Sequence, residues 1–363
     1  MIYALSIDWL SFFCTSKTGV LAEYVTESIE STFSWEYEKA DHGTRHYKEL
    51  ITVKKDGEDI FEVQQLPCSS VLAQNSMIIK VCNRFLYSRG LFYYIDMFFS
   101  QQDISINNIS RVDICTDFNY FANRLHPISL INKFLSNKWR HIGRGIGTAH
   151  FNHFSKRKDK ESRSYLNYTG LSFGSKKSDC RAYLYNKSFE LLTVKDKPHI
   201  RQLWRQAGLI DDAKNNVWRL EISISSKGMT FGDRATKEKI TISRGKIADS
   251  SMLSMIYFAF VKSLFSFIKN RKGITNVTRE PRIELFNGEP YIDRCILNTD
   301  SGGDRTERIL IKQLWQLSER YRGMATIEDE GITKIMASEL AACTGLADWL
   351  ADKKREWKQP TKK

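Results

Sequence analysis

Apolar and polar residues alternate along much of the first 230 residues. Neighbouring side chains of a β-strand point to opposite faces, so this alternation predicts strands. The pair Asp56-Gly57 separates two of these segments and predicts a tight hairpin, because such pairs accept the left-handed backbone of a two-residue turn. The predicted strands are residues 3–13, 45–53, 60–65, 77–86, 110–118, 164–173, 181–187 and 217–225.

Apolar residues recur at helical spacing elsewhere in the chain. The predicted helices are residues 92–99, 127–135, most of 188–209, and then 250–269, 307–322 and 333–352, with a further strand at 281–286. Together these elements predict an α+β fold, a central antiparallel sheet flanked by helices. We expect this domain in residues 1–230, a mainly helical C-terminal region in 231–352 and a basic tail in 353–363.

The charge balance favours a polyanionic partner. The chain has 55 Lys plus Arg against 42 Asp plus Glu, a formal net charge of +13, and such an excess favours binding to polyanions such as nucleic acid. Residues 140–160 are rich in Gly, His, Lys and Arg and contain Lys156, Arg157 and Lys158. We predict a mobile basic loop there, which is either a solvated linker or an arm that contacts DNA.

The cysteines indicate a reducing compartment. The seven cysteines are widely spaced and form no Cys-x-x-Cys pair, so neither a disulfide framework nor a zinc ribbon is expected. No export signal is evident, and the most apolar stretch, residues 250–268, is interrupted by Lys262. A membrane-spanning helix needs about 20 largely apolar residues. We therefore expect a soluble, cytoplasmic protein.

Two of the predicted strands carry acidic residues on one face. Asp113 and Asp117 share a face with Arg111, and Glu221 shares a face with Arg219 on the second strand. Carboxylates on an apolar strand are costly unless they are neutralised. A salt bridge to Arg111 or to another arginine would neutralise them. Mg²⁺ or Mn²⁺, bound by Asp113, Asp117 and Glu221 together, would do so as well.

The turn at residues 174–179 has the sequence Gly-Ser-Lys-Lys-Ser-Asp. A small, polar, doubly basic turn between two strands can offer backbone N–H groups and the side chains of Lys176 and Lys177 to phosphate. The strand that follows places Arg181, Tyr183, Tyr185 and Lys187 on one face. A tyrosine hydroxyl can attack a phosphodiester and remain joined to the phosphate, although tyrosines on strands more often pack.

These motifs occur in a recognisable order. They are Arg-x-Asp-x-x-x-Asp from Arg111, Phe-Gly-Ser-Lys-Lys-Ser-Asp from Phe173, Tyr-Asn-Lys-x-x-Glu from Tyr185 and Arg-x-Glu-Ile from Arg219, preceded by Ile-Asp-Trp-Leu-Ser-Phe from Ile7. In this order, residues 7–224 resemble the replication initiation factor (Rep trans) family. That family includes rolling-circle replication initiators of plasmids and filamentous phages, and related mobilisation relaxases. Leu184 departs from the family's Arg-x-Tyr pattern and leaves Tyr183 as an alternative to Tyr185.

The resemblance implies a sheet like that of HUH endonucleases and a metal-dependent enzyme that nicks and rejoins DNA. By the family pattern, Tyr185 would attack one strand at a replication origin and keep its 5′ phosphate. Asp113, Asp117 and Glu221 would be candidates for binding Mg²⁺ or Mn²⁺. The cations expected to contact DNA are Lys176, Lys177, Arg181, Lys187, Lys156, Arg157 and Lys158. The expected partner is origin DNA, single-stranded or melted, with a host helicase, a polymerase and a second copy of the chain as further possibilities.

Other assignments stay open. His150 and His153 resemble the paired histidines of many nicking enzymes, but their spacing does not place both rings on one strand face. Arg111, His141, Arg144 and Tyr185 occur in an order similar to that of tyrosine recombinases, whose active sites are helical. A regulator that binds a DNA sequence without cutting it, or a mobilisation relaxase, would also fit the basic charge.

Overall fold

The computed structural model describes residues 3–21, 35–158, 161–175, 177–194, 196–210, 216–233, 239–271, 276–287 and 295–297, together with Ser338 and Leu350. The chain divides into two compact units, Met1–Leu297 and Asn298–Lys363. Nearly all described residues belong to the first unit. The predicted helices at 307–322 and 333–352 and the tail at 353–363 therefore lie outside the description and stay predictions.

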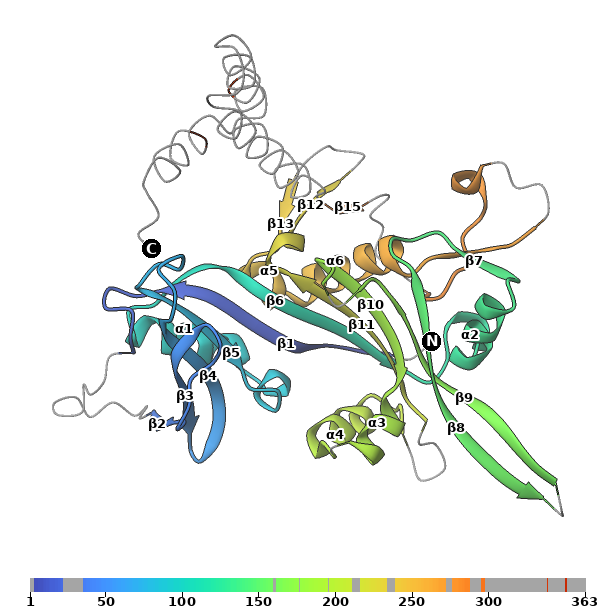
Figure 1. Ribbon diagram of the computed structural model, residues 1–363, viewed down its shortest axis with the longest axis horizontal. Coiled ribbons are helices and arrows are strands. Elements are labelled where there is room, and N and C mark those ends of the chain that lie inside the picture. The colour runs from blue at the N-terminus through green and yellow to red at the C-terminus, as the bar shows by residue number, and fades with distance from the viewer. Residues whose placement is uncertain are drawn as a thin grey trace, which may run out of the picture. The chain divides into compact units, whose positions relative to one another are not determined.

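A ten-stranded antiparallel sheet forms the centre of the first unit, in the order β2-β3-β4-β5-β1-β6-β11-β10-β9-β8 (Figure 1). This confirms the predicted α+β class with a central antiparallel sheet. Its strands are β1 (Tyr3–Thr15), β2 (Glu36–Lys39), β3 (Tyr47–Lys55), β4 (Glu58–Pro67), β5 (Ser76–Val81), β6 (Ser105–Phe118), β8 (Gly147–Lys158), β9 (Glu161–Phe173), β10 (Cys180–Asn186) and β11 (Trp218–Ser225).

Helices and short strands complete this unit. The helices are α1 (Leu91–Gln101), α2 (Pro127–Leu135), α3 (Lys187–Thr193), α4 (Pro198–Gln206), α5 (Arg244–Ala248) and α6 (Ser250–Leu264). The 3-10 turns are η1 (Phe85–Tyr87), η2 (Ala122–Arg124), η3 (Ser226–Gly228) and η4 (Val277–Arg279). Two small sheets are formed by β12 (Thr230–Asp233), β13 (Lys239–Thr241) and β15 (Cys295–Leu297), and by β7 (Trp139–His141) and β14 (Phe267–Lys269). Residues 230–297 thus contribute α5, α6 and short strands to the same compact unit, whereas the sequence placed a boundary after residue 230.

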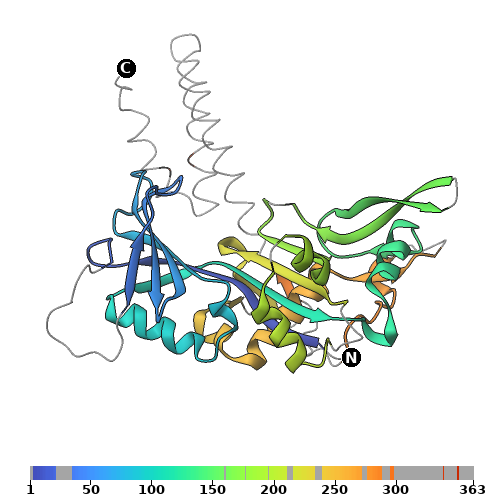
Figure 2. The ribbon, with the colours of Figure 1, turned by 90° about the horizontal axis from the view of Figure 1, so that it is seen from below.

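The hairpin between β3 and β4 forms where the sequence predicts it. Asp56 and Gly57 both have positive φ, 51° and 73°, which is the backbone that a two-residue turn between antiparallel strands requires. Helix α1 lies against this half of the sheet (Figure 2), and its aromatic residues contact the strands. Phe98 stacks on Phe61 of β4 with ring centroids 4.7 Å apart, and Phe99 contacts Phe12 of β1.

Helix α6 covers one face of the middle of the sheet. Its Tyr257 hydroxyl is buried, lies 2.6 Å from the Thr116 hydroxyl and donates to the Leu220 carbonyl. The Asp249 side chain accepts a hydrogen bond from the Met252 backbone N–H and so caps the helix, as expected from its place before the apolar run. The helix ends at Leu264, and residues 267–269 of the predicted helix form β14 instead.

The opposite face is partly covered as well. Helices α3 and α4 pack against its edge through a small apolar cluster that includes Ala4, Leu191, Ile200 and Trp204. Helices therefore lie on both faces of the middle strands. The same face carries the buried polar residues described below.

Three further segments differ from prediction. Most of the predicted loop at 140–160 is a strand instead, because β8 pairs with β9 from Gly147 to Lys158 and the two strands form a long ribbon (Figure 1). Local composition suggested a loop, but pairing with a distant segment decides the structure. The predicted strand 281–286 makes only an isolated bridge between Arg282 and Ile268. The predicted strand 77–86 ends at Val81 and is followed by η1.

Among the described residues, no helix is long and apolar enough to cross a membrane.

Candidate active site

The polar face of the sheet is assembled from β1, β6, β11 and β10, which are neighbours in that order. In antiparallel pairs, residues directly opposite each other share a face. Asp117 lies opposite Arg219, which in turn lies opposite Tyr185. Glu221 lies opposite Tyr183. The residues that the sequence placed on separate strands therefore meet on one face.

Arg219 lies at the centre of this face and is completely buried. Its Nε and a terminal nitrogen donate to the two carboxylate oxygens of Asp117 at 2.6 and 2.7 Å. The Trp204 indole of α4 donates to the same carboxylate at 2.7 Å. Both oxygens of Asp117 are thus occupied, and the arginine salt bridge that the sequence left open as an alternative is the observed arrangement for this residue.

Asp8 is a fourth acidic residue of the site, and it was not among the residues predicted for it. A register shift in the β1–β6 pairing lies between Ile7 and Trp9, which makes Asp8 the extra residue of a β-bulge. Its carboxylate oxygen lies 2.7 Å from Arg219 and accepts a hydrogen bond from the Tyr87 hydroxyl at 2.6 Å. Burial alone would raise the pKa of Asp8, but Arg219 and Lys187 hold it well below its usual range. The sequence does contain a signal that could have identified Asp8, because it is a charged residue within the apolar strand predicted at residues 3–13.

Asp113 is buried and paired with its neighbour on the same strand face. Arg111 Nε donates to Asp113 at 2.9 Å, and a second nitrogen of the same guanidinium contacts the other carboxylate oxygen. The guanidinium also lies over the Trp9 ring, 4.6 Å from its centroid. The sequence left a salt bridge or a metal ion as alternatives for neutralising Asp113, and the salt bridge to Arg111 is the one observed.

Glu221 differs from these aspartates because no arginine among the described residues donates to it. The Tyr185 hydroxyl donates to Glu221 Oε2 at 3.0 Å, and both groups are buried. Burial and the nearby charges of Asp113 and Asp8 raise the pKa of Glu221 to about 7, against the opposing effects of Arg219 and the Tyr185 hydrogen bond. A carboxyl group with such a pKa can accept or release a proton near neutral pH.

Lys187 brings a buried positive charge to the same tyrosine. The structure places it at the first position of α3, one residue after the strand on which the sequence placed it. Its Nζ donates to the Tyr185 hydroxyl at 3.4 Å and to Glu190 Oε2 at 2.8 Å. The Asn186 side chain caps α3 by accepting from the Phe189 N–H, which fixes the position at which Lys187 enters the site.

Tyr183 lies beside Tyr185 but is more exposed. Their rings stack with centroids 4.7 Å apart. The His150 ring of β8 contacts Tyr183 edge-on at 5.2 Å, and the Arg181 guanidinium lies 5.7 Å from the Tyr183 ring. Burial, and then the charge of Arg181, lower the pKa of His150. His150 therefore approaches the tyrosines, whereas the side chain of His153 lies outside the description.

The acidic residues do not form a metal site as they are arranged. Within the described ranges, no group of three or more His, Cys, Asp and Glu side chains is placed to hold a metal ion. Asp113 and Glu221 do share a face on adjacent strands, but Asp117 is fully engaged by Arg219 and Trp204. The expected joint coordination by Asp113, Asp117 and Glu221 is not present in this arrangement.

The basic turn at residues 174–179 connects β9 to the beginning of β10. Gly174 has a φ of +90°, a conformation that favours glycine, and Ser175 and Ser178 hydrogen-bond across the turn. Lys177 is exposed there, whereas Lys176 lies outside the described residues. The backbone of Lys156, Arg157 and Lys158 belongs to β8, but their side chains also lie outside the description. The structure therefore places Lys177, Arg181 and Lys187 on or next to β10 and leaves the rest as predictions.

Comparison with known proteins finds a likeness among solved structures. No family model and no curated protein matches the chain. Among solved structures, the chain is similar to the rolling circle replication initiator protein from Geobacillus stearothermophilus, with a TM-score of 0.39 and 16% sequence identity over 77% of this chain and 92% of that chain. A likeness at this level carries no argument about function, so the conclusions below depend on the site itself.

Proposed function

We propose that the chain is a rolling-circle replication initiator that nicks and rejoins one DNA strand through Tyr185. The observation that carries the proposal is the hydrogen bond from the Tyr185 hydroxyl to Glu221, a carboxyl group whose pKa lies at about 7. A weak nucleophile needs an adjacent base, and a base is most effective when its pKa is close to the working pH. The motif order from Arg111 to Glu221 supports the same function.

The reaction follows from these contacts. The Tyr185 oxygen attacks the phosphorus, while its proton passes to Glu221. A bond forms between that oxygen and phosphorus, and the bond from phosphorus to the 3′ oxygen breaks. The 3′ oxygen takes up the proton that Glu221 returns, which leaves a 3′ hydroxyl and a 5′-phosphotyrosine. Attack by the 3′ hydroxyl reverses these steps and rejoins the strand.

Positive groups around Tyr185 would stabilise the negative charge that develops on the phosphate. Lys187 Nζ lies 3.4 Å from the tyrosine oxygen, and Arg181 lies on the same strand face. Lys197 is a further cation near the site, and burial lowers its pKa. Lys176 and Lys177 of the turn, with Lys156–Lys158 of β8, would hold phosphates farther along the strand.

We propose that the reaction also requires Mg²⁺ or Mn²⁺. A hard cation would be held by carboxylate oxygens of Asp8, Asp113 or Glu221, after Arg111 had moved away from Asp113. Reactions in EDTA, Mg²⁺ and Mn²⁺ test this requirement. Full adduct formation in EDTA would remove the metal from the proposal and leave the tyrosine in place.

The direct test is a search for the covalent product. Single-stranded oligonucleotides that tile the replicon's origin region, labelled at the 3′ end, are incubated with the protein and separated on a denaturing gel. The proposal expects labelled DNA that migrates with the protein and disappears after proteolysis. Absence of such a product with every oligonucleotide, in Mg²⁺ and in Mn²⁺, would overturn it.

A second function is favoured by one observation. Asp113 and Asp117 are both neutralised by arginines, as in a face built for stability rather than for metal-dependent cleavage. A protein that binds origin DNA in sequence-specific fashion without cutting it would fit this arrangement. Specific, salt-sensitive binding without any covalent product would support that alternative. Host helicase, polymerase, a second copy of the chain and a cytoplasmic location remain proposals that belong with either function.

A further inference from the structure

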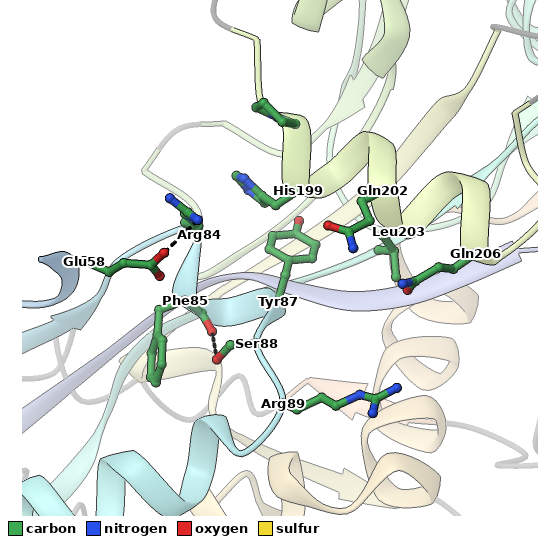
Figure 3. A pocket seen from close by; sticks show the side chains of 11 residues that line it. Glu58, Arg84, Phe85, Tyr87, Ser88, Arg89, His199, Gln202, Leu203 and Gln206 are labelled. Atoms are coloured by element: carbon green, nitrogen blue, oxygen red, sulfur yellow. Dashed lines mark hydrogen bonds and ion pairs between the residues drawn. The ribbon is translucent and has the colours of Figure 1, made fainter. Parts of the chain in front are cut away.

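A pocket of ≈ 530 Å³ opens between η1, with the residues that follow it, and one side of α4 (Figure 3). Its volume falls within the range of roughly 300–1,000 Å³ that is typical of small-molecule sites. Tyr87 lies between the two walls, and α4 directs His199, Gln202 and Gln206 to the same space (Figure 3). The other wall contributes Arg84 and Arg89.

The pocket adjoins the polar face of the sheet. Tyr87, which lines it, donates to Asp8 at 2.6 Å, and Arg219 donates to the Tyr87 hydroxyl at 3.3 Å. His199 lies 3.3 Å from the Asn83 side-chain oxygen, and Asn83 donates to the Asp8 backbone carbonyl at 3.0 Å. A single layer of side chains therefore separates the pocket from the residues around Tyr185.

The aromatic part of the pocket is neutral. The His199 and Tyr87 rings lie 5.2 Å apart. Burial, followed by the charges of Lys197 and Arg84, lowers the pKa of His199 to about 4. At neutral pH the imidazole is therefore uncharged, and the two rings offer flat surfaces on which a nucleic-acid base can stack.

Three polar groups complete the pocket. Gln202 and Gln206 are exposed and stand one helical turn apart, and their side-chain amides make no hydrogen bond with the part of the chain that the structure describes. A glutamine amide can donate to and accept from the edge of one base at the same time. Arg89 is also exposed and forms no ion pair with the described residues, whereas Arg84 pairs with Glu58 at 2.7 Å. Arg89 is the cation that remains available for a phosphate.

We propose that this pocket binds one nucleotide of the DNA strand, next to the nucleotide at Tyr185. Its base would contact Tyr87, His199 and the two glutamines, and its phosphate would contact Arg89. The inference rests on the proposed function, because the strand must cross the polar face to reach the pocket. A free nucleotide would offer the pocket the same base and phosphate groups. The experiment therefore distinguishes a nucleotide within a DNA strand from a free nucleotide.

The first arm measures equilibrium binding of a fluorescein-labelled, random-sequence DNA strand of about 20 nucleotides, a length that exceeds common single-strand site sizes. The double substitution Q202A/Q206A should weaken binding about tenfold, and R89A should weaken it severalfold. The matched control is R205A on the same helix, also exposed and outside the pocket. The R205A variant should have nearly the affinity of the wild type, with a small loss because one positive charge is removed. Circular dichroism checks that the variants fold.

The second arm locates the strand and excludes a free nucleotide. A strand containing 4-thiothymidine should cross-link under light to peptides that carry Tyr87 or His199. Unchanged binding of the Q202A/Q206A variant, or an equal loss in R205A, would overturn the proposal. Binding of ATP that depends on Gln202 and Gln206, while binding of the strand does not, would also overturn it in favour of a free-nucleotide site.

These outcomes are independent of cleavage. A wild-type protein that binds the strand through the pocket but never forms a covalent product would refute the proposed nicking and leave the pocket standing. A wild-type protein that forms the product, together with a Q202A/Q206A variant of normal affinity, would refute the pocket alone.

Discussion

The two halves of the ten-stranded sheet use charge in different ways. In the half formed by β3, β4 and β5, ion pairs such as Lys80–Glu62 lie at the surface, with both side chains partly exposed. In the half formed by β6, β11 and β10, Arg219 and Asp117 are fully buried. Exposed pairs contribute little to stability, whereas buried charges are tolerated only when their partners are in place. The charges of the first half therefore contribute little to stability, whereas those of the second half are buried ionised groups that their partners hold in fixed positions.

The largest effect should come from the nucleophile. Tyr185→Phe keeps the ring but removes the attacking oxygen, so the covalent product should disappear on denaturing gels. The free energy of unfolding should fall by only about 1 kcal/mol for the lost hydrogen bond. Tyr183→Phe is the matched control on the same strand face and should retain most of the product. An inactive Tyr183→Phe beside an active Tyr185→Phe would transfer the role to Tyr183.

Removal of the buried arginine tests the comparison most directly. Arg219→Ala leaves Asp117 charged and unpaired in the interior, which should lower the free energy of unfolding by about 3–5 kcal/mol in urea titrations. Lys80→Ala, in the other half, should cost less than about 1 kcal/mol. Similar costs for the two substitutions would contradict the distinction between the halves.

The pH dependence should show opposite trends for stability and activity. The folded protein holds the proton of Glu221 up to about pH 7, above its usual pKa of 4.5. Folded protein therefore binds more protons than unfolded protein in this window, and stability should fall as pH rises from about 4.5 to 7. Adduct formation should rise about tenfold per pH unit and level off above pH 7, because the base form of Glu221 is needed.

Glu221→Gln separates the two trends. The variant lacks the titrating group, so thermal melts should lose most of the fall in stability between these pH values. Its adduct formation should be low at every pH. A Gln variant with the wild-type pH profile of activity would exclude Glu221 as the base.

The smallest expected effect concerns the basic turn. Replacing Lys176 and Lys177 by Ala should weaken binding to all single-stranded sequences and reduce the slope of log affinity against log salt by about 1.4, since each phosphate contact on a single strand contributes about 0.7. Fluorescence anisotropy between low and moderate salt measures this slope. An unchanged slope would remove the turn from the DNA-binding surface.

The periodic parts of the fold were predictable from the sequence. Strands β6 and β11 were expected as 110–118 and 217–225, and α2 was expected at its observed residues 127–135. Strong alternation or helical spacing is a local property, so it can be recognised without knowledge of the partners. The ribbon of β8 and β9 was missed at β8, because only its pairing with β9 makes a glycine- and lysine-rich segment into a strand.

The candidate site was predictable in part. Alternation within each strand predicts that Asp113 shares a face with Asp117 and that Tyr183 shares a face with Tyr185, but it predicts neither the order of the strands nor that these faces coincide. For that reason, the salt bridge between Asp117 and Arg219 could not be chosen over a metal site in advance. The pocket beside α4 was not predictable, since η1 and α4 are far apart in the sequence and meet only through the fold.

The bulge at Asp8 reverses the alternation of side chains along β1, so that different positions face the polar side before and after it. Before it, Ala4 and Ser6 lie opposite Asp117 and Cys115 on the polar face, whereas after it Trp9 and Ser11 occupy that face. Deletion of Asp8 would remove the bulge and make the alternation continuous. The side chains at one end of the strand would then point to the opposite face, so that buried residues such as Phe12 would face the wrong side. This strand should therefore reject the loss of a single residue at this position.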